Sequence, residues 1–400
     1  MDDMEYILRI QERRIKELIK RKKSVLLLGP RQTGKSTLLK NIKVDLNISF
    51  LKPEFRIRYE KNPELLEKEI NALLLKNKQL TVIIDEIQKI PQTLDVIQDI
   101  IDNKKAIFIL TGSSARKLKR GNDVNLLPGR LISVRLDPFV INEIPKSDLM
   151  EILMFGSLPG IYTIKNLLHK EEELESYVTN YLEEEVRAEA IVRNLGSFAR
   201  FLELSAQESG NIINLRSLSQ EIGVSHTTIS SYFQILEDCL IIERIEPITE
   251  SKTRKRLTKA QKYLFFDQGV RRISAGEGKK QPKEYLGKLF EQFVGLELIR
   301  CSRLSKEKYK IKFWRDSDGP EVDWVAEKEG LYIPIEVKFT DTPNKKDIKH
   351  LKVFLNEYKN STMAYVICQT PRMYLLDKNI LAIPWQEIDN YFLDSFPTSS

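Results

Sequence analysis

The stretch that decides the fold is Leu26-Leu27-Leu28-Gly29-Pro30-Arg31-Gln32-Thr33-Gly34-Lys35-Ser36-Thr37. An apolar run breaks into a turn with a glycine at each end, and apolar residues resume at Leu38. This spacing, G-x-x-x-x-G-K-[S/T], is that of the phosphate-binding P-loop. Glycines at both ends let consecutive backbone N–H groups turn toward phosphate oxygens, and the following helix adds its positive end. The stretch therefore predicts a strand, a loop and a helix that bind a nucleoside triphosphate.

Each residue type in this loop has its own expected task. Lys35 is expected to reach the β and γ phosphates, and the hydroxyl of Ser36 is expected to bind Mg²⁺. An ordinary Gly-Pro turn is the alternative, but it leaves a Lys-Ser pair at the start of a helix unexplained. The predicted nucleotide-binding residues are Gly29, Pro30, Arg31, Gln32, Thr33, Gly34, Lys35, Ser36 and Thr37.

A second apolar run, Leu80 to Ile84, ends in the acidic pair Asp85 and Glu86. At the end of a parallel strand, Asp85 can hold Mg²⁺ while Glu86 polarises the water that attacks the γ-phosphate. A third run, Ala106 to Leu110, precedes Ser113. This serine either senses the γ-phosphate or belongs to a plain Ser/Thr turn. We therefore expect the two acids, and in the first case the serine, to act in ATP hydrolysis.

The composition excludes several classes of protein. With 400 residues, of which 42% are hydrophobic, the chain is long enough for two or three folded domains. Lys and Arg number 64 against 57 Asp and Glu, and this net charge of +7 permits nucleic acid partners without requiring them. Three distant cysteines favour neither a disulfide framework nor a zinc site. No apolar run approaches the roughly 18 residues of a membrane span, so we expect a soluble, cytoplasmic protein without a membrane partner.

The chain resembles the prokaryotic AAA-type P-loop ATPases that carry a C-terminal domain of unknown function. The resemblance covers nearly the whole chain and rests on the P-loop, Ile84 to Gln88, Leu110 to Arg116, Pro128-Gly129-Arg130, and Leu136 to Phe139. It implies ATP hydrolysis with ATP and Mg²⁺ as cofactors, and it leaves a homo-oligomer open.

The same resemblance implies a role for Arg130. In the family the Gly-Arg element lies near the nucleotide, so this side chain is a candidate for stabilising charge on the γ-phosphate, in its own chain or in a neighbouring one. A planar guanidinium suits that task. The alternative is that Arg130 only pairs with a carboxylate between domains.

Residues 215 to 236 predict a helix, a glycine turn and a second helix. Gly223 permits the tight turn and Ser225 is a natural N-cap. Two apolar runs around 240–245 and 262–266 are expected to form the strands of a wing with a basic tip between them. The candidate DNA contacts are His226, Thr227, Ser230, Lys252, Arg254, Lys255 and Arg256. The exposed helix face lacks Arg and Asn, so base-specific recognition is not supported, and a packing or oligomerisation role stays open.

The last third of the chain carries a second set of chemical groups. Asp323 precedes a predicted hairpin turn, and Glu336-Val337-Lys338 follows it. Because side chains alternate along a strand, Glu336 and Lys338 share one face. With Asp323 on the paired strand, two carboxylates can hold a divalent metal while Lys338 positions a water for phosphodiester cleavage. A plain surface hairpin is the alternative.

This pattern resembles the restriction-endonuclease-like PD-(D/E)xK fold, whose upstream helical acid is matched by Glu291. The resemblance implies a possible Mg²⁺-dependent nuclease with Glu291, Asp323, Glu336 and Lys338 at its site and Asp323 and Glu336 on the metal. Because a fold can persist as a binding module for DNA or a protein, cleavage and binding both stay open.

Together these patterns predict an α/β chain with a P-loop NTPase parallel sheet, a helical and winged-helix middle, and a restriction-endonuclease-like α/β domain at the C-terminus. The expected boundaries are 1–145 for the ATPase domain, 146–210 for a helical connector, 211–270 for the winged helix-turn-helix and 271–400 for the nuclease-like domain. The function expected from them is an ATPase that acts on or near DNA.

Overall fold

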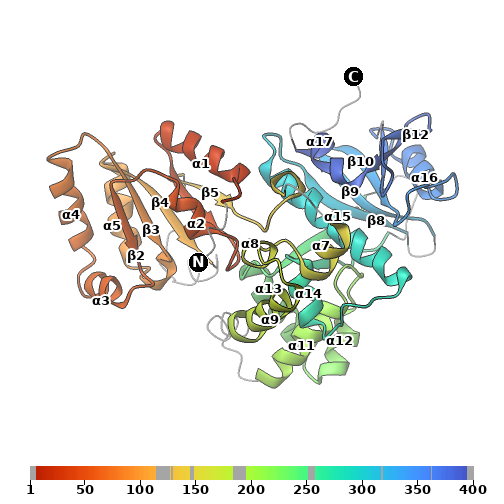
Figure 1. Cartoon of the computed structure of the whole chain (residues 1–400), viewed down its shortest axis with the longest axis horizontal. Coiled ribbons are helices and arrows are strands. Elements are labelled where there is room, and N and C mark those ends of the chain that lie inside the picture. Colours follow the sequence, from red (N-terminus) through yellow and green to blue (C-terminus); the bar gives the residue numbers. More distant parts are fainter. Residues whose placement is uncertain are drawn as a thin grey trace.

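The computed structural model shows three parts that lie side by side (Figure 1). It describes residues 6–113, 127, 129–144, 148–182, 195–250, 257–316, 319–361 and 363–393. A parallel sheet with its helices forms the amino-terminal part, helices form most of the middle, and a larger sheet forms the carboxyl-terminal part. The predicted fold class is therefore confirmed.

The first sheet has five parallel strands in the order β2-β3-β4-β1-β5. They are β1 (Ser24–Leu28), β2 (Leu46–Ser49), β3 (Leu80–Asp85), β4 (Ala106–Gly112) and β5 (Leu131–Arg135). The accompanying helices are α1 (Ile10–Lys20), α2 (Lys35–Lys40), α3 (Pro53–Lys61), α4 (Leu65–Leu74), η1 (Ile87–Lys89) and α5 (Thr93–Asp102). Because all strands run the same way, their carboxyl ends share one edge, where the P-loop and Asp85 both lie.

The middle of the chain is helical. Its elements are η2 (Ile141–Glu143), α7 (Leu149–Phe155), α8 (Pro159–Tyr162), α9 (Leu167–Ser176), the π-helix η3 (Tyr177–Leu182), α11 (Leu195–Gln207), α12 (Leu215–Ile222), α13 (His226–Asp238) and α14 (Gln268–Ser274). Phe201 of α11 packs edge-on against Phe233 of α13, with ring centroids 4.8 Å apart. The boundary expected after residue 210 is therefore wrong, because α11 shares an aromatic core with α13.

Helices α12 and α13 form the predicted helix-turn-helix. Gly223 takes a left-handed conformation with φ of 76°, which a side chain would strain. Ser225 caps α13 by accepting a hydrogen bond from the Thr228 backbone N–H at 3.1 Å. Ile229 and Phe233 are buried against the neighbouring helices.

The second sheet has eight strands in the order β12-β13-β11-β10-β9-β8-β6-β7. They are β6 (Ile242–Pro247), β7 (Lys262–Phe265), β8 (Lys310–Arg315), β9 (Glu321–Lys328), β10 (Leu331–Val337), β11 (Ala364–Cys368), β12 (Tyr374–Asp377) and β13 (Ile380–Pro384). Strands β6 and β7 pair antiparallel where the two strands of the wing were expected, and β6 also pairs with β8 through Glu246 and Lys312. The boundary expected after residue 270 is thus corrected, because one sheet continues from the hairpin into the C-terminal part.

Helices cover both faces of this second sheet. They are α15 (Lys283–Leu304), α16 (Lys349–Glu357), η4 (Trp385–Glu387) and α17 (Ile388–Phe392). Phe293 of α15 packs in one core with Trp324 and Ile335. Phe354 of α16 belongs to a separate core with Val325, on the other face. Alternate residues of β9 thus enter different cores, as the pleat of a strand buried on both faces requires.

A charged joint connects the ATPase sheet to α15. Arg303 of α15 contacts Asp137 at 3.0 Å and Glu243 at 2.6 Å, and Arg135 at the end of β5 pairs with the same two acids. Burial alone would raise the pKa of Asp137, but the neighbouring arginines, Arg303 and Arg135 foremost, lower it to about 2. The four side chains fix the segment that leaves β5 against α15.

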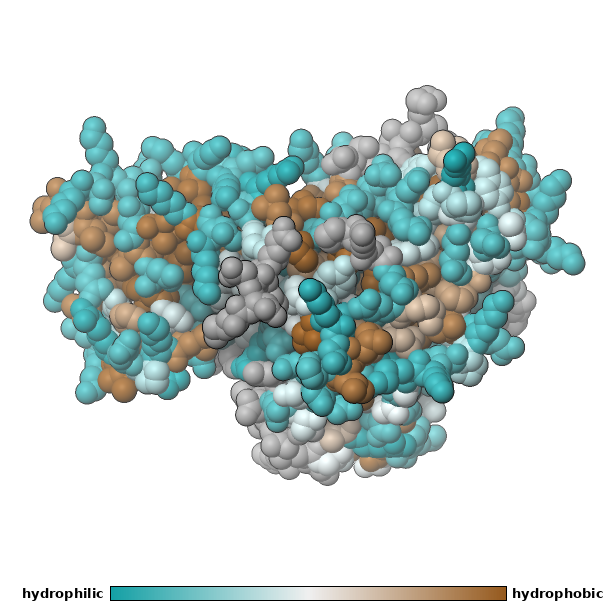
Figure 2. Space-filling view, in the orientation of Figure 1, coloured by the Kyte–Doolittle hydropathy of each residue, from teal (hydrophilic) through white to brown (hydrophobic). Residues whose placement is uncertain are grey.

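Hydrophilic residues cover much of the face drawn in Figure 2, and hydrophobic residues form separate patches on it. Within the described ranges, no helix is both long enough and apolar enough to cross a membrane. The three cysteines, Cys239, Cys301 and Cys368, are buried free thiols.

Glu297 of α15 makes stability depend on pH. The carboxylate accepts hydrogen bonds from the Ile141 backbone N–H at 3.1 Å and from Arg300 at 2.8 Å, and it is 1% exposed. Burial raises its pKa from 4.5 to about 7, against the opposing charge of Arg300 and with further repulsion from Asp389. The folded protein therefore retains a proton that the unfolded chain releases, so folding loses free energy as the pH rises through this interval.

Glu297→Gln keeps an acceptor for Ile141 but does not titrate. Relative to this variant, the free energy of unfolding of the wild type should fall by about 2 kcal/mol between about pH 4.5 and pH 7. Urea unfolding of both proteins across that range measures it. A difference that stays constant with pH would contradict the assignment.

Candidate functional site

The P-loop adopts a conformation that depends on its glycines. Gly34 has φ of 88° and Gln32 has φ of 61°, both in the left-handed region. A Cβ added to Gly29 would lie 2.3 Å from the carbonyl oxygen of Leu136. Lys35 lies across the loop, with its amine 2.7 Å from the Gly29 carbonyl oxygen and 2.9 Å from that of Pro30. The amine is therefore held at the mouth of the loop, where P-loop lysines meet phosphates.

The rest of the predicted loop residues follow this geometry. Thr33 is buried and donates its hydroxyl to the Pro30 carbonyl oxygen at 2.9 Å. Ser36 and Thr37 are exposed in the first turn of α2, so their hydroxyls are accessible to a bound ion. Arg31 presents its carbonyl oxygen to the hydroxyl of Tyr177 at 3.4 Å.

Asp85 and Glu86 lie at the same edge, held by residues that the sequence pattern did not single out. The hydroxyl of Thr111, at the end of β4, donates to the Asp85 carboxylate at 2.5 Å and accepts from the Glu86 backbone N–H at 3.0 Å. The side-chain amide of Gln88 donates to Glu86 at 2.6 Å and to Ser113 at 3.2 Å. One hydroxyl and one amide thus fix both acids and the predicted sensor. The sequence signal that could have identified them is position, since Thr111 lies at the end of a predicted strand and Gln88 follows Glu86 by two residues.

Arg9 is a second residue that sequence reasoning missed. Its guanidinium is 4% exposed and donates to the carbonyl oxygens of Thr33 and Asp137, each at 2.7 Å, and to Glu143 at 3.0 Å. One side chain therefore ties the P-loop to the segment that α15 holds. A single Arg near the start of the chain gives no sequence signal of this kind.

Arg130 does not lie at the phosphate edge. It directly precedes β5, where Leu131 pairs with Ser24, while the P-loop begins after the far end of β1. A strand of this length separates the two positions by about 13 Å. Arg130 instead donates to the Asp102 carboxylate at 2.6 and 2.8 Å. The predicted role at its own γ-phosphate is wrong, because parallel strands put their two ends on opposite edges, and a role on a neighbouring chain stays a prediction.

The candidate DNA contacts are only partly described. His226, Thr227 and Ser230 are exposed on α13. Ser230 donates its hydroxyl to the His226 carbonyl oxygen at 3.1 Å, as serines in helices often do. Lys252, Arg254, Lys255 and Arg256 lie outside the described residues. Contact with DNA therefore stays a prediction.

The structure brings the acids of the second set together. Asp323 on β9 accepts a hydrogen bond from the Val337 backbone N–H at 2.8 Å, which places it beside Glu336 on β10. Lys338 donates to Glu336 at 2.7 Å. Glu291 on α15 accepts from Lys262 of β7 at 3.2 Å. Lys262 was not predicted as a site residue, and its place in another segment of the chain hid it.

The electrostatics of these acids fit a cation. Burial raises the pKa of Asp323 well above its usual range, and the charges of Glu336 and Glu291 raise it further. Burial also raises the pKa of Glu336 to about 7, although Lys338 opposes the shift. One oxygen of Glu336, Oε2, is buried without a hydrogen-bond partner. In the part of the chain that the structure describes, no three acidic, His or Cys side chains are already arranged around a common metal position.

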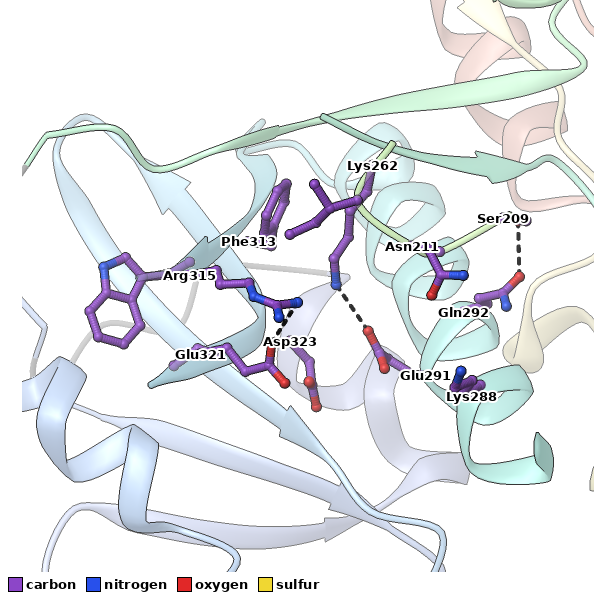
Figure 3. A pocket seen from close by; sticks show the side chains of 14 residues that line it. Ser209, Asn211, Lys262, Lys288, Glu291, Gln292, Phe313, Arg315, Glu321 and Asp323 are labelled. Carbon is purple, nitrogen blue, oxygen red and sulfur yellow. Dashed lines mark hydrogen bonds and ion pairs between the residues drawn. The ribbon is translucent and has the colours of Figure 1, made fainter. Parts of the chain in front are cut away.

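Asp323 and Glu291 border a pocket between the β6–β7 hairpin and the C-terminal sheet (Figure 3). Lys262 points from the hairpin toward Glu291, and Arg315 points toward Glu321 on the opposite wall. Asp323 lies between these two ion pairs in the same view.

Family models match three consecutive parts of the chain. Residues 21–145 match the AAA domain, residues 146–281 match a domain of unknown function (DUF8612), and residues 286–388 match a domain of unknown function (DUF4143). The first match and the strand order both support an AAA-type P-loop ATPase in the amino-terminal part.

Two relatives are similar over most of their length. An uncharacterized protein of Mycobacterium tuberculosis is 24% identical over 377 residues, covering 94% of this chain and 83% of that protein. An uncharacterized protein of Methanocaldococcus jannaschii is 25% identical over 401 residues, covering 85% and 87%. Among solved structures, Cdc6p from Pyrobaculum aerophilum shares 12% identity over 68% of this chain and 94% of its own, with a TM-score of 0.31. That score is too low to support a functional comparison.

Thr111→Val should lower ATP turnover without weakening nucleotide binding. The substitution removes the hydroxyl that holds Asp85 and Glu86 but leaves the P-loop intact, so we expect kcat to fall about tenfold or more. Phosphate release and titration with a fluorescent ATP analogue measure the two quantities. Thr93→Val is the matched control, because Thr93 is equally buried but donates to the Ile90 carbonyl oxygen instead. Equal losses in both variants would contradict the role of Thr111.

Arg130→Ala should leave nucleotide affinity within about twofold of the wild type, because an exposed ion pair at the opposite edge of the sheet contributes little. Lys35→Ala should abolish binding in the same titration. A large loss of affinity in Arg130→Ala at concentrations where the protein is monomeric would show that its placement is wrong.

Proposed function

We propose that this chain couples ATP hydrolysis to Mg²⁺-dependent cleavage of DNA. An ATPase of AAA type is supported by the family match of residues 21–145, and cleavage is the step that we add. The supporting observation is the adjacent acid pair of Asp323, which is partly buried, and Glu336, which is buried and has one carboxylate oxygen without a partner. The other oxygen of Glu336 accepts from the amine of Lys338. Two adjacent carboxylates shielded from water cost free energy unless a proton or a cation neutralises them.

In the nucleotide site, each group has one task. Lys35 neutralises charge on the β and γ phosphates, and backbone N–H groups of the loop orient them. Glu86, fixed through Gln88, orients the attacking water and accepts its proton. Ser36 and Asp85 would hold Mg²⁺.

In the second site, Asp323 and Glu336 would hold Mg²⁺, which when bound neutralises phosphate charge and makes a nearby water more acidic. Lys338 donates a hydrogen bond to the attacking water or to the phosphate oxygen next to it. Its charge is stabilised there, because Glu336 and Asp323 raise the pKa of its amine against the effect of burial. Glu291 completes the acidic wall of the site.

Contacts along the chain connect the two sites through helix α15. Glu291 lies in the amino-terminal half of α15, and Arg303 near its end holds the segment after β5. Arg9 continues that contact to the P-loop. A shift of the loop on hydrolysis would therefore act on the segment that α15 clamps, which is the physical basis for coupling.

A regulatory ATPase with a C-terminal binding module is the second candidate. The observation that favours it is the ion pair between Lys262 and Glu291, which neutralises the acid beside the proposed metal ligands. Under this alternative, substitution of Asp323 would change no catalytic activity.

Cleavage should require Asp323 and Lys338. With Mg²⁺ or Mn²⁺, the wild type should nick or degrade DNA, and Asp323→Ala and Lys338→Ala should each lower the rate by at least about 100-fold. Gel analysis of supercoiled, linear and single-stranded DNA, with and without ATP, measures this.

Asp341→Ala is the matched control, because Asp341 is an exposed acid three residues after Lys338. It should cleave as the wild type does. DNA that stays intact with the wild type on every substrate would refute the nuclease and favour the binding module.

A further inference from the structure

The pocket beside Asp323 is lined by two parts of the chain, the middle part and the C-terminal part. Asn211, from the loop before α12, and Lys262, from β7, form one wall. Lys288 and Glu291 of α15 and Arg315 of β8 form the others, together with Asp323. Figure 3 shows these side chains converging on one space. The helix-turn-helix part therefore closes over the acids of the C-terminal sheet.

Lys262 holds strand β7 against helix α15 and the C-terminal sheet at this pocket. Its side chain is only 12% exposed, its amine lies 3.2 Å from Glu291, and it sits over the rings of Phe313 at 5.0 Å and Trp324 at 5.2 Å. An amine held by a carboxylate and two aromatic faces is a rigid positive charge. The hairpin therefore brings a cation to the pocket at a fixed position, next to the proposed metal site.

The other two cations of the pocket can accept a ligand. Arg315 pairs with Glu321 at 3.2 Å, but both side chains are 49% exposed, so water or an anion competes for the guanidinium at little cost. Lys288 is exposed and has no ion-pair partner among the residues that the structure describes. Two accessible cations flanking an acidic site match the phosphates on either side of a reacting phosphodiester.

The size of the pocket limits what can enter. Its volume is about 180 Å³. Pockets that take drug-sized ligands measure roughly 300 to 1,000 Å³, so this space holds about one sugar-phosphate unit. A base-paired unit is larger than this space, whereas one unit of an unpaired strand matches its volume.

We propose that this pocket binds one nucleotide unit of a single strand of DNA, with its flanking phosphates on Lys288 and Arg315. The inference rests on the proposed function for the reason why a strand is bound there, and it adds the class of substrate. Lys262 then acts as a positioning residue, which holds Glu291 and narrows the entrance.

Binding without cleavage tests the pocket directly. We would measure fluorescence anisotropy of the full-length chain with EDTA, using a labelled single strand of about 15 nucleotides and the blunt duplex of the same sequence. The double variant Lys288→Ala/Arg315→Ala should weaken single-strand binding about tenfold or more and duplex binding by less than about twofold.

Two further variants control for folding and for charge. Asn211→Asp places a carboxylate at the exposed rim of the pocket and should also weaken single-strand binding. Lys349→Ala removes one exposed lysine from α16, on the other face of the sheet, and should leave both affinities within about twofold. Equal losses for duplex and single strand, or no loss for the single strand, would overturn the proposal.

Failure of the pocket and failure of the nuclease give different results. If the pocket variants lose single-strand binding while the wild type cleaves no DNA, the pocket stands and cleavage fails. If the wild type cleaves duplex DNA while single-strand binding ignores these variants, cleavage stands and the pocket fails.

Discussion

The ion pairs of Arg303 with Asp137 and Glu243 join the ATPase part of the chain to helix α15 of the C-terminal part. The two acids come from different segments, one after β5 and one at the start of the second sheet, and both are nearly buried. Removing Arg303 would leave the two acids to share Arg135, so two largely buried negative charges would lose one of the cations that offset them. That loss is more costly than the loss of an exposed pair. The orientation of the ATPase sheet relative to α15 follows from this requirement.

The same ion pairs lie on a continuous set of contacts between the P-loop and the C-terminal part. The segment after β5 touches the P-loop through Leu136, whose carbonyl oxygen abuts Gly29, and through Arg9, which binds both Thr33 and Asp137. The same segment is capped by acids of the C-terminal part, since Glu297 accepts from Ile141 and Asp389 accepts from Asn142. These contacts form a continuous connection from the P-loop to the helix that carries Glu291.

Sequence patterns with a local cause were predicted well. Apolar runs that end in Gly29 or in Asp85 gave strands of a parallel sheet, and Gly223 with Ser225 gave the helix-turn-helix, because turns, caps and buried strands depend on neighbouring residues. The boundaries after 210 and 270 failed for the opposite reason. An aromatic core and a parallel pairing of β6 with β8 join segments that no local pattern links.

The sequence by itself determined the fold class and which residue types can bind phosphate or metal, since these follow from spacing and period. Only the tertiary structure decided where those residues lie. In the structure, Arg130 lies at the edge of the sheet opposite the P-loop. Lys262 contacts Glu291, which lies 29 residues later in the chain. The direction of a strand decides at which edge of the sheet each of its ends lies. Packing between distant segments decides which charged side chains meet. A local sequence motif contains neither kind of information.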